Sequence, residues 1–167
     1  MGGGGFKTAV SRCFKEPTSI ADKRLAWEVE QCVQYDDNYS PLVDKIRHAI
    51  GLEYEYVLQE KVRNLDLDFK DEDDLRREGY AKTPDIMLNL PVAVDGHVVN
   101  WIESKASFGD DYSHTQNLPQ FWGYQNRYGP GLVIYWFGFV DDLDADRAKG
   151  ILVSDRFPEN VVRMSLA

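Results

Sequence analysis

The chain has 167 residues, of which 43% are hydrophobic and 13% aromatic, a composition that supports one compact domain with a real core rather than a disordered segment. Its net charge is −9 and its pI is near 4.8. This balance argues against a general electrostatic grip on polyanions, because nonspecific nucleic-acid binding depends mainly on lysine and arginine. The acidic residues cluster at 66–74 and 141–146, so a local basic rim elsewhere remains compatible with the sequence.

Two classes of segment are missing from the sequence. It contains no run of about 18 apolar residues, and its start has neither the basic region nor the apolar stretch of a signal peptide. We therefore expect an intracellular protein, nuclear or cytoplasmic, without a membrane partner. The glycines at 2–5 are typical of a linker, so residues 1–17 are predicted to be a linker or frayed terminus and residues 18–167 a single domain.

Two helices are predicted before the first strands. The first begins at a cap formed by Thr18 or Ser19 and contains the apolar residues of 25–32. The second has Pro41 in its first turn, where a missing N–H costs nothing. Apolar residues recur every three or four positions over 42–65, which predicts one continuous buried stripe along this helix.

A β-hairpin follows these helices. The acidic stretch 66–78 is predicted to be a solvated turn and a short helix. Apolar residues then alternate over 86–94, and a second strand-like segment covers 98–102. Asp95-Gly96 between them is typical of a tight turn, so the two strands should pair antiparallel.

The remaining segments predict a sheet of mixed direction. Residues 116–128 read as a helix that ends at Gly129-Pro130-Gly131. The nearly continuous apolar run over 132–140 is expected for a strand buried on both faces, and residues 151–153 predict another strand. The expected fold class is α/β: a mixed sheet flanked by helices, with an N-terminal helical segment.

Residues that suit metal-dependent phosphodiester hydrolysis flank the hairpin. Such chemistry needs carboxylates that hold a divalent metal and a cation near the attacking water. Asp85 precedes the first strand, and Glu103-Ser104-Lys105 ends the second. Side chains alternate along a strand, so Glu103 and Lys105 project together while Ser104 can offer its backbone carbonyl. Such hard oxygen ligands favour Mg²⁺ or Mn²⁺.

The register of the hairpin decides whether these residues form a site. A two-residue turn, Asp95-Gly96, would place Asp85 and Glu103 on opposite faces of the sheet. A three-residue loop that includes His97, or an equivalent β-bulge, would place Asp85, Glu103 and Lys105 on one face. We predict the second arrangement. Alone, Thr-Pro-Asp is usually a turn and Glu-x-Lys a solvated ion pair, so the prediction depends on their meeting.

The spacing of Asp85 and Glu103-Ser104-Lys105 resembles the PD-(D/E)xK nuclease superfamily. A longer set of segments resembles the codanin-interacting nuclease family, which is also described by its Thr-Pro-Asp motif. These segments are Tyr39–Asp44, His48–Gly51, Lys82–Asp85, Trp101–Gly109 and Gly129–Trp136. The likeness covers nearly the whole chain from about residue 17.

The resemblance implies a restriction-endonuclease-like fold related to Holliday junction resolvases, and a codanin-like protein partner. It also implies that Asp85 and Glu103 are metal ligands and that Lys105 positions or activates the nucleophilic water. Superfamily members often add a glutamate from the preceding helix. Of the two glutamates there, Glu55 lies on the shoulder of the apolar stripe and is preferred to Glu53 as a further ligand.

Other polar residues have weaker claims to the site. Gln120 and Tyr124 form a Gln-x-x-x-Tyr pattern that resembles a feature of RecB-like superfamily members, and helical spacing places both on one face. Gln120 is the better site candidate, while core packing explains Tyr124 equally well. Asp110 and His114 are expected in the loop after Lys105, where either could approach a metal or phosphate, but a lone loop histidine is more often an ordinary surface residue.

Two functions remain after the sequence is read. The first is a divalent-metal-dependent nuclease, with DNA as the expected substrate. The second is a nuclease-fold scaffold that mainly binds a codanin-like protein, an alternative that the acidic balance favours. The sequence does not distinguish DNA from RNA or indicate an oligomeric state.

Overall fold

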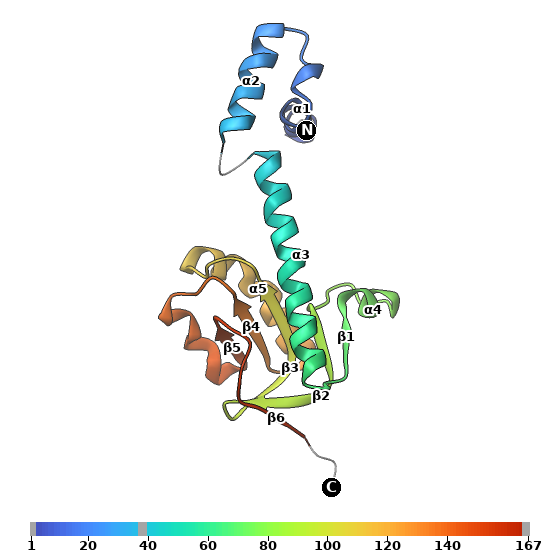
Figure 1. The fold of residues 1–167 in the computed structure, drawn as a ribbon, viewed down its shortest axis with the longest axis vertical. Helices are drawn as coiled ribbons and strands as arrows, with labels where there is room; N and C mark the ends of the chain where they lie inside the picture. The colour runs from blue at the N-terminus through green and yellow to red at the C-terminus, as the bar shows by residue number, and fades with distance from the viewer. Residues whose placement is uncertain (1–2, 37–39, 165–167) are drawn as a thin grey trace. The chain divides into compact units, whose positions relative to one another are not determined.

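The computed structural model of the chain describes residues 3–36 and 40–164 (Figure 1). It contains two compact units, residues 1–50 and 51–167. Within the described residues, no helix combines the length and the apolar composition needed to cross a membrane.

Helices make up the first unit. They are α1 (Gly3–Lys15), the 3₁₀ turn η1 (Pro17–Ser19), α2 (Lys23–Tyr35) and the first turns of α3 (Pro41–Asn64). Most of the segment predicted to be a linker or frayed terminus, residues 3–15, is therefore helical. The segment after the glycines has apolar residues at helical spacing, among them Val10, Cys13 and Phe14, and this pattern outweighs the flexibility of the glycines.

The starts of α2 and α3 are set by their capping residues. Asp22, not Thr18 or Ser19, caps α2, and its carboxylate accepts hydrogen bonds from the backbone of Arg24 at 2.9 Å and Leu25 at 3.1 Å. Thr18 and Ser19 instead lie in η1, where the Ser19 hydroxyl donates to the Glu16 carbonyl at 2.7 Å. For α3 the prediction is confirmed, because Pro41 is its first residue.

Only the second half of α3 is buried. Leu58 and Val62 are fully enclosed against the sheet, whereas Leu42 and Ile46 are 58% and 49% exposed. The predicted continuous buried stripe is therefore wrong for the first half of this helix.

A six-stranded mixed sheet forms the centre of the second unit. The strands are β1 (Phe69–Asp71), β2 (Ile86–Val94), β3 (His97–Lys105), β4 (Gly131–Tyr135), β5 (Ile151–Ser154) and β6 (Val161–Arg163). Their order is β1-β2-β3-β4-β5, and β6 pairs with β2. Strands β1, β2, β3 and β6 pair antiparallel, while β3, β4 and β5 are parallel. The predicted mixed α/β architecture is confirmed at this level.

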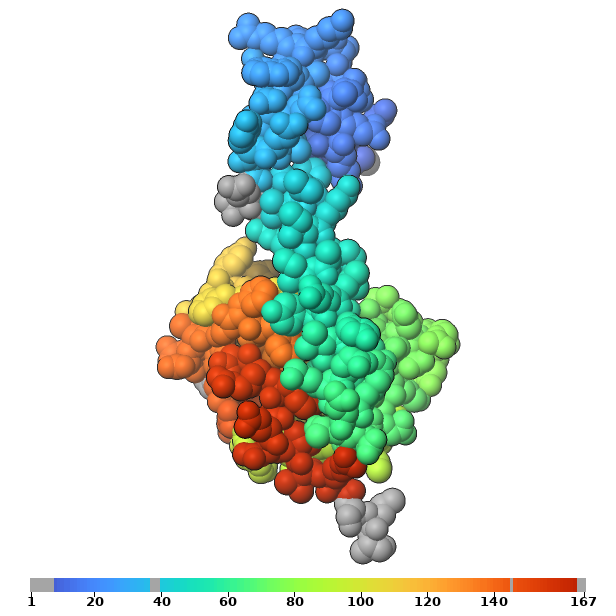
Figure 2. Space-filling model, in the orientation of Figure 1, coloured from blue at the N-terminus to red at the C-terminus, as the bar shows by residue number. Residues whose placement is uncertain are grey.

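The short strands β1 and β6 were not predicted. The acidic stretch was expected to be solvated, yet β1 pairs with the start of β2 and leads into α4 (Glu72–Arg77). The segment before β6 runs beside the last turns of α3 (Figure 2). Between these segments, Lys61 Nζ lies 6.0 Å from the ring centroid of Phe157. Arg163 at the end of β6 donates a hydrogen bond to the carbonyl of Leu65.

A β-bulge sets the register of the hairpin. The turn has two residues, because Val94 pairs with His97, so the predicted three-residue loop is wrong. Between Met87 and Val92 the register shifts, and Ile86 then pairs with Ile102. The equivalent bulge that we proposed as the other possibility is therefore present. It restores the alternation that brings the start of β2 and the end of β3 onto matching faces.

Helices cover both faces of this sheet. On one face, Leu58 and Val62 of α3 pack on Ile86 and Ile102 within the larger core cluster. On the other, α5 (Asp111–Tyr128) covers β3 and β4. The 3₁₀ segment η2 (Asp141–Lys149) connects β4 to β5. The end of β3 therefore lies between two layers of helix.

Candidate active site

Asp85 lies at the point where β2 begins beside the end of β3. Its carboxylate Oδ2 accepts a hydrogen bond from the backbone N–H of Ser104 at 2.7 Å. Ile86 pairs with Ile102, so Asp85 lies next to Glu103 across the two strands. The bulge thus brings these two acidic residues together, 18 positions apart in the chain.

Glu103 has a buried carboxylate, of which one oxygen accepts hydrogen bonds and the other does not. The residue is only 3% exposed. Its Oε1 accepts from Lys105 Nζ at 2.8 Å and from Gln120 Nε2 at 3.1 Å. Its Oε2 is buried without a hydrogen-bond partner among the described residues. A buried charged oxygen with no partner is costly, so it fits a site that a bound cation completes.

Lys105 is held by groups from two elements. Besides its 2.8 Å contact with Glu103, its ammonium group lies 3.4 Å from Gln120 Oε1 and 5.7 Å from the ring centroid of Phe121. Gln120 Nε2 is 2.6 Å from the hydroxyl of Tyr124, which donates to the Thr83 carbonyl at 2.7 Å. Helix α5 is therefore connected to β3, which carries Glu103, and to the segment just before β2, which carries Asp85.

The two carboxyls resist ionisation in this environment. Burial, and then the neighbouring charge of Glu103, raise the pKa of Asp85 well above its ordinary value. Burial also raises the pKa of Glu103, against the opposing effect of Lys105. Two neighbouring carboxylates, one buried and one half-buried, favour a bound proton or a bound cation.

An open pocket of about 550 Å³ connects the site residues to solvent. Glu55, Asp85, Glu103 and Gln120 all line it, and Glu55 is close enough to raise the pKa of Asp85. Glu53, by contrast, is exposed. The structure thus brings four of the sequence-predicted site residues to one pocket.

The predicted metal ligands do not form one compact cluster. Over residues 3–36 and 40–164, no three acidic, histidine or cysteine side chains lie close enough together to hold a metal ion. Asp85 and Glu103 lie side by side, and Glu55 stands on the pocket wall. Ser104 is not a lining residue, and its hydroxyl accepts from Trp136 Nε1 at 2.8 Å. Its backbone carbonyl remains the only group with which it could contribute.

Sequence reasoning missed the acidic residue at the start of α4. Glu72 lines the same pocket, where its Oε1 accepts from Thr83 Oγ1 at 3.2 Å and pairs with Arg76 at 2.6 Å. Nothing local in the sequence marks Glu72, because the stretch around it looks solvated. The pairing of β1 with β2 is what brings α4 to the site.

His114 and Asp110 have structural roles. Neither lies in an open loop: Asp110 caps α5 by accepting from the Ser113 backbone at 2.6 Å, and His114 is in the first turn of that helix. His114 is buried, its Nδ1 is 3.1 Å from the Tyr135 hydroxyl, and burial lowers its pKa. The interpretation of His114 as a surface residue is wrong, and neither residue lines the pocket of Asp85.

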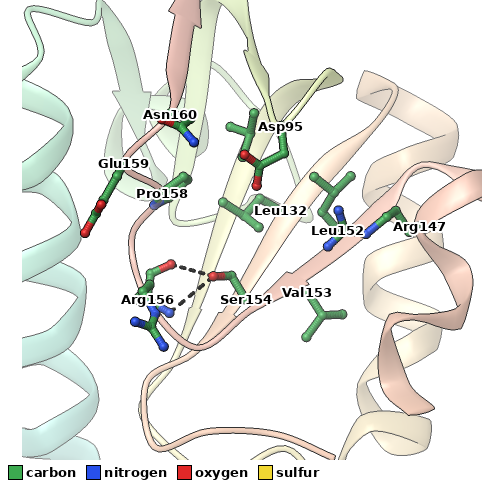
Figure 3. Close-up of a pocket in the computed structure, with 11 residues that line it drawn as sticks. Asp95, Leu132, Arg147, Leu152, Val153, Ser154, Arg156, Pro158, Glu159 and Asn160 are labelled. Atoms are coloured by element: carbon green, nitrogen blue, oxygen red, sulfur yellow. Dashed lines mark hydrogen bonds between the residues drawn. The ribbon is translucent and has the colours of Figure 1, made fainter. Parts of the chain in front are cut away.

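A second cavity, of about 320 Å³, lies at the opposite end of β2 (Figure 3). Its arginines are already paired, Arg147 with Asp144 at 2.7 Å and Arg156 with Asp155 at 2.7 Å. The backbone of Arg156 forms two hydrogen bonds with the Ser154 hydroxyl, drawn as dashed lines in Figure 3. These contacts are explained by the turn that follows β5.

The fold and pocket define a mixed α/β domain with a buried glutamate, a half-buried aspartate beside it and an adjacent lysine. Residues 21–157 match the family described as "Protein of unknown function TPD sequence-motif", and the chain belongs to this family. It is also similar to proteins named CDAN1-interacting nuclease 1. The zebrafish protein is 56% identical over 156 residues, which cover 93% of this chain and 52% of the relative. The human protein is 52% identical over 159 residues, covering 95% of this chain and 57% of the relative.

The chain therefore spans little more than half the length of these relatives. No solved structure matches it significantly.

Proposed function

We propose that this chain is a divalent-metal-dependent nuclease of the PD-(D/E)xK type, with a restriction-endonuclease-like fold, that hydrolyses phosphodiester bonds in DNA. The observation that carries the proposal is the buried Oε2 of Glu103, which has no partner among the described residues and lies beside Asp85 and Lys105. The name of the zebrafish and human relatives, which includes the word nuclease, supports it. An intracellular location, nuclear or cytoplasmic, belongs to the same proposal.

Asp85 and Glu103 would hold the metal, with Glu55 and the Ser104 carbonyl as further oxygen groups. Hard oxygen donors at an open pocket suit Mg²⁺ or Mn²⁺. When bound, the metal supplies positive charge that favours ionisation of the attacking water and offsets charge developing on the phosphate.

The protein's own groups would orient and assist the reaction. Glu103 and Gln120 hold the Lys105 ammonium group in place, at 2.8 and 3.4 Å. A fixed cation beside the pocket stabilises negative charge on the phosphate and on the attacking water, without reorganisation during the reaction. Tyr124 holds Gln120 in position, because its hydroxyl accepts a hydrogen bond from Gln120 Nε2 and donates one to the Thr83 carbonyl.

Replacing Glu103 with glutamine tests the proposal. Glu103→Gln keeps the shape of the side chain but removes the charge that a metal would need. We expect cleavage to fall at least roughly 100-fold, the cost of losing one central electrostatic group. The assay is gel analysis of labelled single-stranded, duplex, flap and junction DNA, with and without Mg²⁺ or Mn²⁺.

A matched pair of glutamates on α3 supplies the control. Glu55→Gln should weaken cleavage because Glu55 lines the pocket, and Glu53→Gln should not because Glu53 is exposed. Unchanged metal-dependent cleavage by Glu103→Gln would refute the assignment of the site.

A second candidate function is that of a nuclease-fold scaffold that mainly binds a codanin-like protein. The relatives are named for an interaction with CDAN1. Helix α2 contains no buried residue and leaves Leu25, Trp27 and Tyr35 exposed. Exposed aromatic residues of this kind are typical anchors of protein interfaces, and catalysis and partner binding are compatible in one chain.

A further inference from the structure

Acidic neighbours neutralise most of the basic side chains in residues 51–164. Ion pairs hold Arg63, Lys70, Arg76, Arg77, Lys105, Arg147, Lys149 and Arg156. Four basic residues of this range form no ion pair with any described residue: Lys61, Lys82, Arg127 and Arg163. Within residues 51–164 of a chain of net charge −9, these are the positive charges without an ion pair that an anionic ligand could meet.

Two of these unpaired cations are neighbours. Arg127 Nη1 lies 3.4 Å from the carbonyl oxygen of Lys82, and the Tyr128 hydroxyl donates to the same oxygen at 3.3 Å. Both basic residues are exposed. Lys61 lies over Phe157 and Arg163 binds the Leu65 carbonyl, so neither belongs to this group.

The pair lies at the rim of the candidate active site. Lys82 lines the pocket that contains Asp85 and Glu103. Arg127 is on α5, seven residues beyond Gln120, which contacts Glu103 directly. At 1.5 Å per residue, Arg127 is about 10 Å farther along the helix axis than Gln120. A nucleic-acid strand rises about 3.4 Å per nucleotide, so this offset corresponds to about three nucleotides.

We propose that Lys82 and Arg127 bind the phosphate backbone of the substrate strand about three nucleotides from the bond that is cut at Asp85 and Glu103. This inference rests on the proposed nuclease function and defines the position of its substrate. Because these two cations have no acidic partner, binding a phosphate releases their counterions without breaking an ion pair. Lys82 and Arg127 give this acidic protein a local basic rim beside the candidate active site, where a polyanionic substrate would have to bind.

Nucleic acid fits this rim better than an acidic protein segment does. Lys82 lines one pocket with the acidic pair, and Arg127 lies beside Lys82, so a ligand that reaches all of them must carry anionic groups and also tolerate a carboxylate-lined centre. A phosphodiester strand does so when a divalent cation occupies the centre, and its charges recur at a fixed spacing.

Salt-dependent DNA binding by the full chain tests the proposal. Binding of a labelled single strand and a labelled duplex is measured by fluorescence anisotropy, with Ca²⁺ replacing Mg²⁺, over a range of NaCl concentrations. Each of Lys82→Ala and Arg127→Gln should reduce the slope of log K against log salt by about 0.7 to 0.9. At 0.1 M salt this corresponds to about five- to eightfold weaker binding, regardless of sequence.

Two control variants separate a loss of phosphate binding from a loss of folding. Lys82→Arg preserves the charge and should retain the slope and affinity of the wild type. Lys61→Ala removes another cation that has no ion pair and should change neither. An unchanged slope in the Lys82→Ala/Arg127→Gln double variant overturns the inference, and so does an equal loss with Lys61→Ala. Tighter binding to poly-glutamate than to DNA, lost in the same variants, also overturns it.

The phosphate position has its own measurement. One phosphate of the labelled strand is replaced by an uncharged methylphosphonate at successive positions. At about the third position from the cut site, this change should weaken wild-type binding but not that of Lys82→Ala. If no methylphosphonate position removes the difference in affinity between the wild type and Lys82→Ala, the proposed phosphate contact is wrong.

Failure of this inference differs from failure of the nuclease proposal. Metal-dependent cleavage that needs Glu103, with no dependence of binding on Lys82 or Arg127, overturns only the phosphate contact. The expected salt slopes without any Glu103-dependent cleavage overturn only the nuclease function.

Discussion

Asp85 and Glu103 connect the chemistry of the site to the stability of the fold. Burial raises the pKa of both groups. Between the ordinary carboxyl pKa of about 4 and the raised value, the folded protein retains protons that the unfolded chain has released. The free energy of unfolding of the metal-free protein therefore falls as the pH rises through this window.

Asp85→Asn should remove part of this pH dependence. Asparagine still accepts the hydrogen bond from the Ser104 N–H, but it carries no buried charge. In EDTA, we expect urea denaturation to show the wild type losing more stability than the variant between pH 5 and pH 8, by on the order of 1 kcal/mol. Adding Mg²⁺ should stabilise the wild type at pH 8 and have little effect on the variant. Parallel pH profiles for the two proteins would contradict the assignment of a buried charge here.

Single residues could be named from sequence where a local pattern marked their chemistry. Asp85, Glu103, Lys105 and Gln120 were all named from sequence, and the structure brings them together. Glu72 was not named, because its position at the pocket depends on strand pairing rather than on any local motif.

Strand β3 and strand β4 meet at a glycine that has no room for a side chain. Gly131 pairs with Trp101, and a Cβ at this position would overlap the Trp101 indole ring. Trp101 is fully buried and lies two residues before Glu103 in β3. The fit between these strands therefore positions the site as well as the core.

Gly131→Ala should destabilise the protein by about 1–3 kcal/mol, as expected for overpacking in a core. Its matched control is Gly123→Ala in α5, where a Cβ would meet nothing within 4 Å. That change should stabilise the protein by about 0.5–1 kcal/mol through helix propensity. Urea denaturation of both variants is the measurement, and equal stability of the two would refute the packing argument.

The hairpin and the faces of its end residues could be predicted from sequence, but the three-residue loop was the wrong choice between the two ways of reaching that register. Alternation located β2 and β3, and Asp95-Gly96 located the turn. The parity that brings Asp85 beside Glu103 comes from a bulge between Met87 and Val92. Pro91 lies inside that segment, and a proline within a strand is typical of a bulge, so the sequence does carry a local mark for it.

The net charge of −9 is a property of the whole molecule, and it suits a basic protein partner better than a polyanion. If the scaffold function applies, we expect Trp27→Ala to weaken binding to purified CDAN1 at least about tenfold, as the loss of an interface anchor does. Because Trp27 is 60% exposed, thermal stability should hardly change. Isothermal titration calorimetry measures the affinity.

Val162→Ala is the control, since this residue of β6 is 65% exposed and lies in the other compact unit. Equal affinities of the Trp27 and Val162 variants would exclude α2 as the binding surface.

The sequence by itself determined the fold class, the central hairpin, helix α5 and the identity of the acidic residues and lysine. It could do so because hydrophobic periodicity and turn chemistry are local properties. Only the tertiary structure decided how far the bulge shifts the register, the arrival of Glu72 at the pocket, the Glu103 oxygen that has no partner among the described residues, and the meeting of Lys82 with Arg127. These features join residues that are distant in the chain, and such contacts depend on how all the strands and helices pack at once.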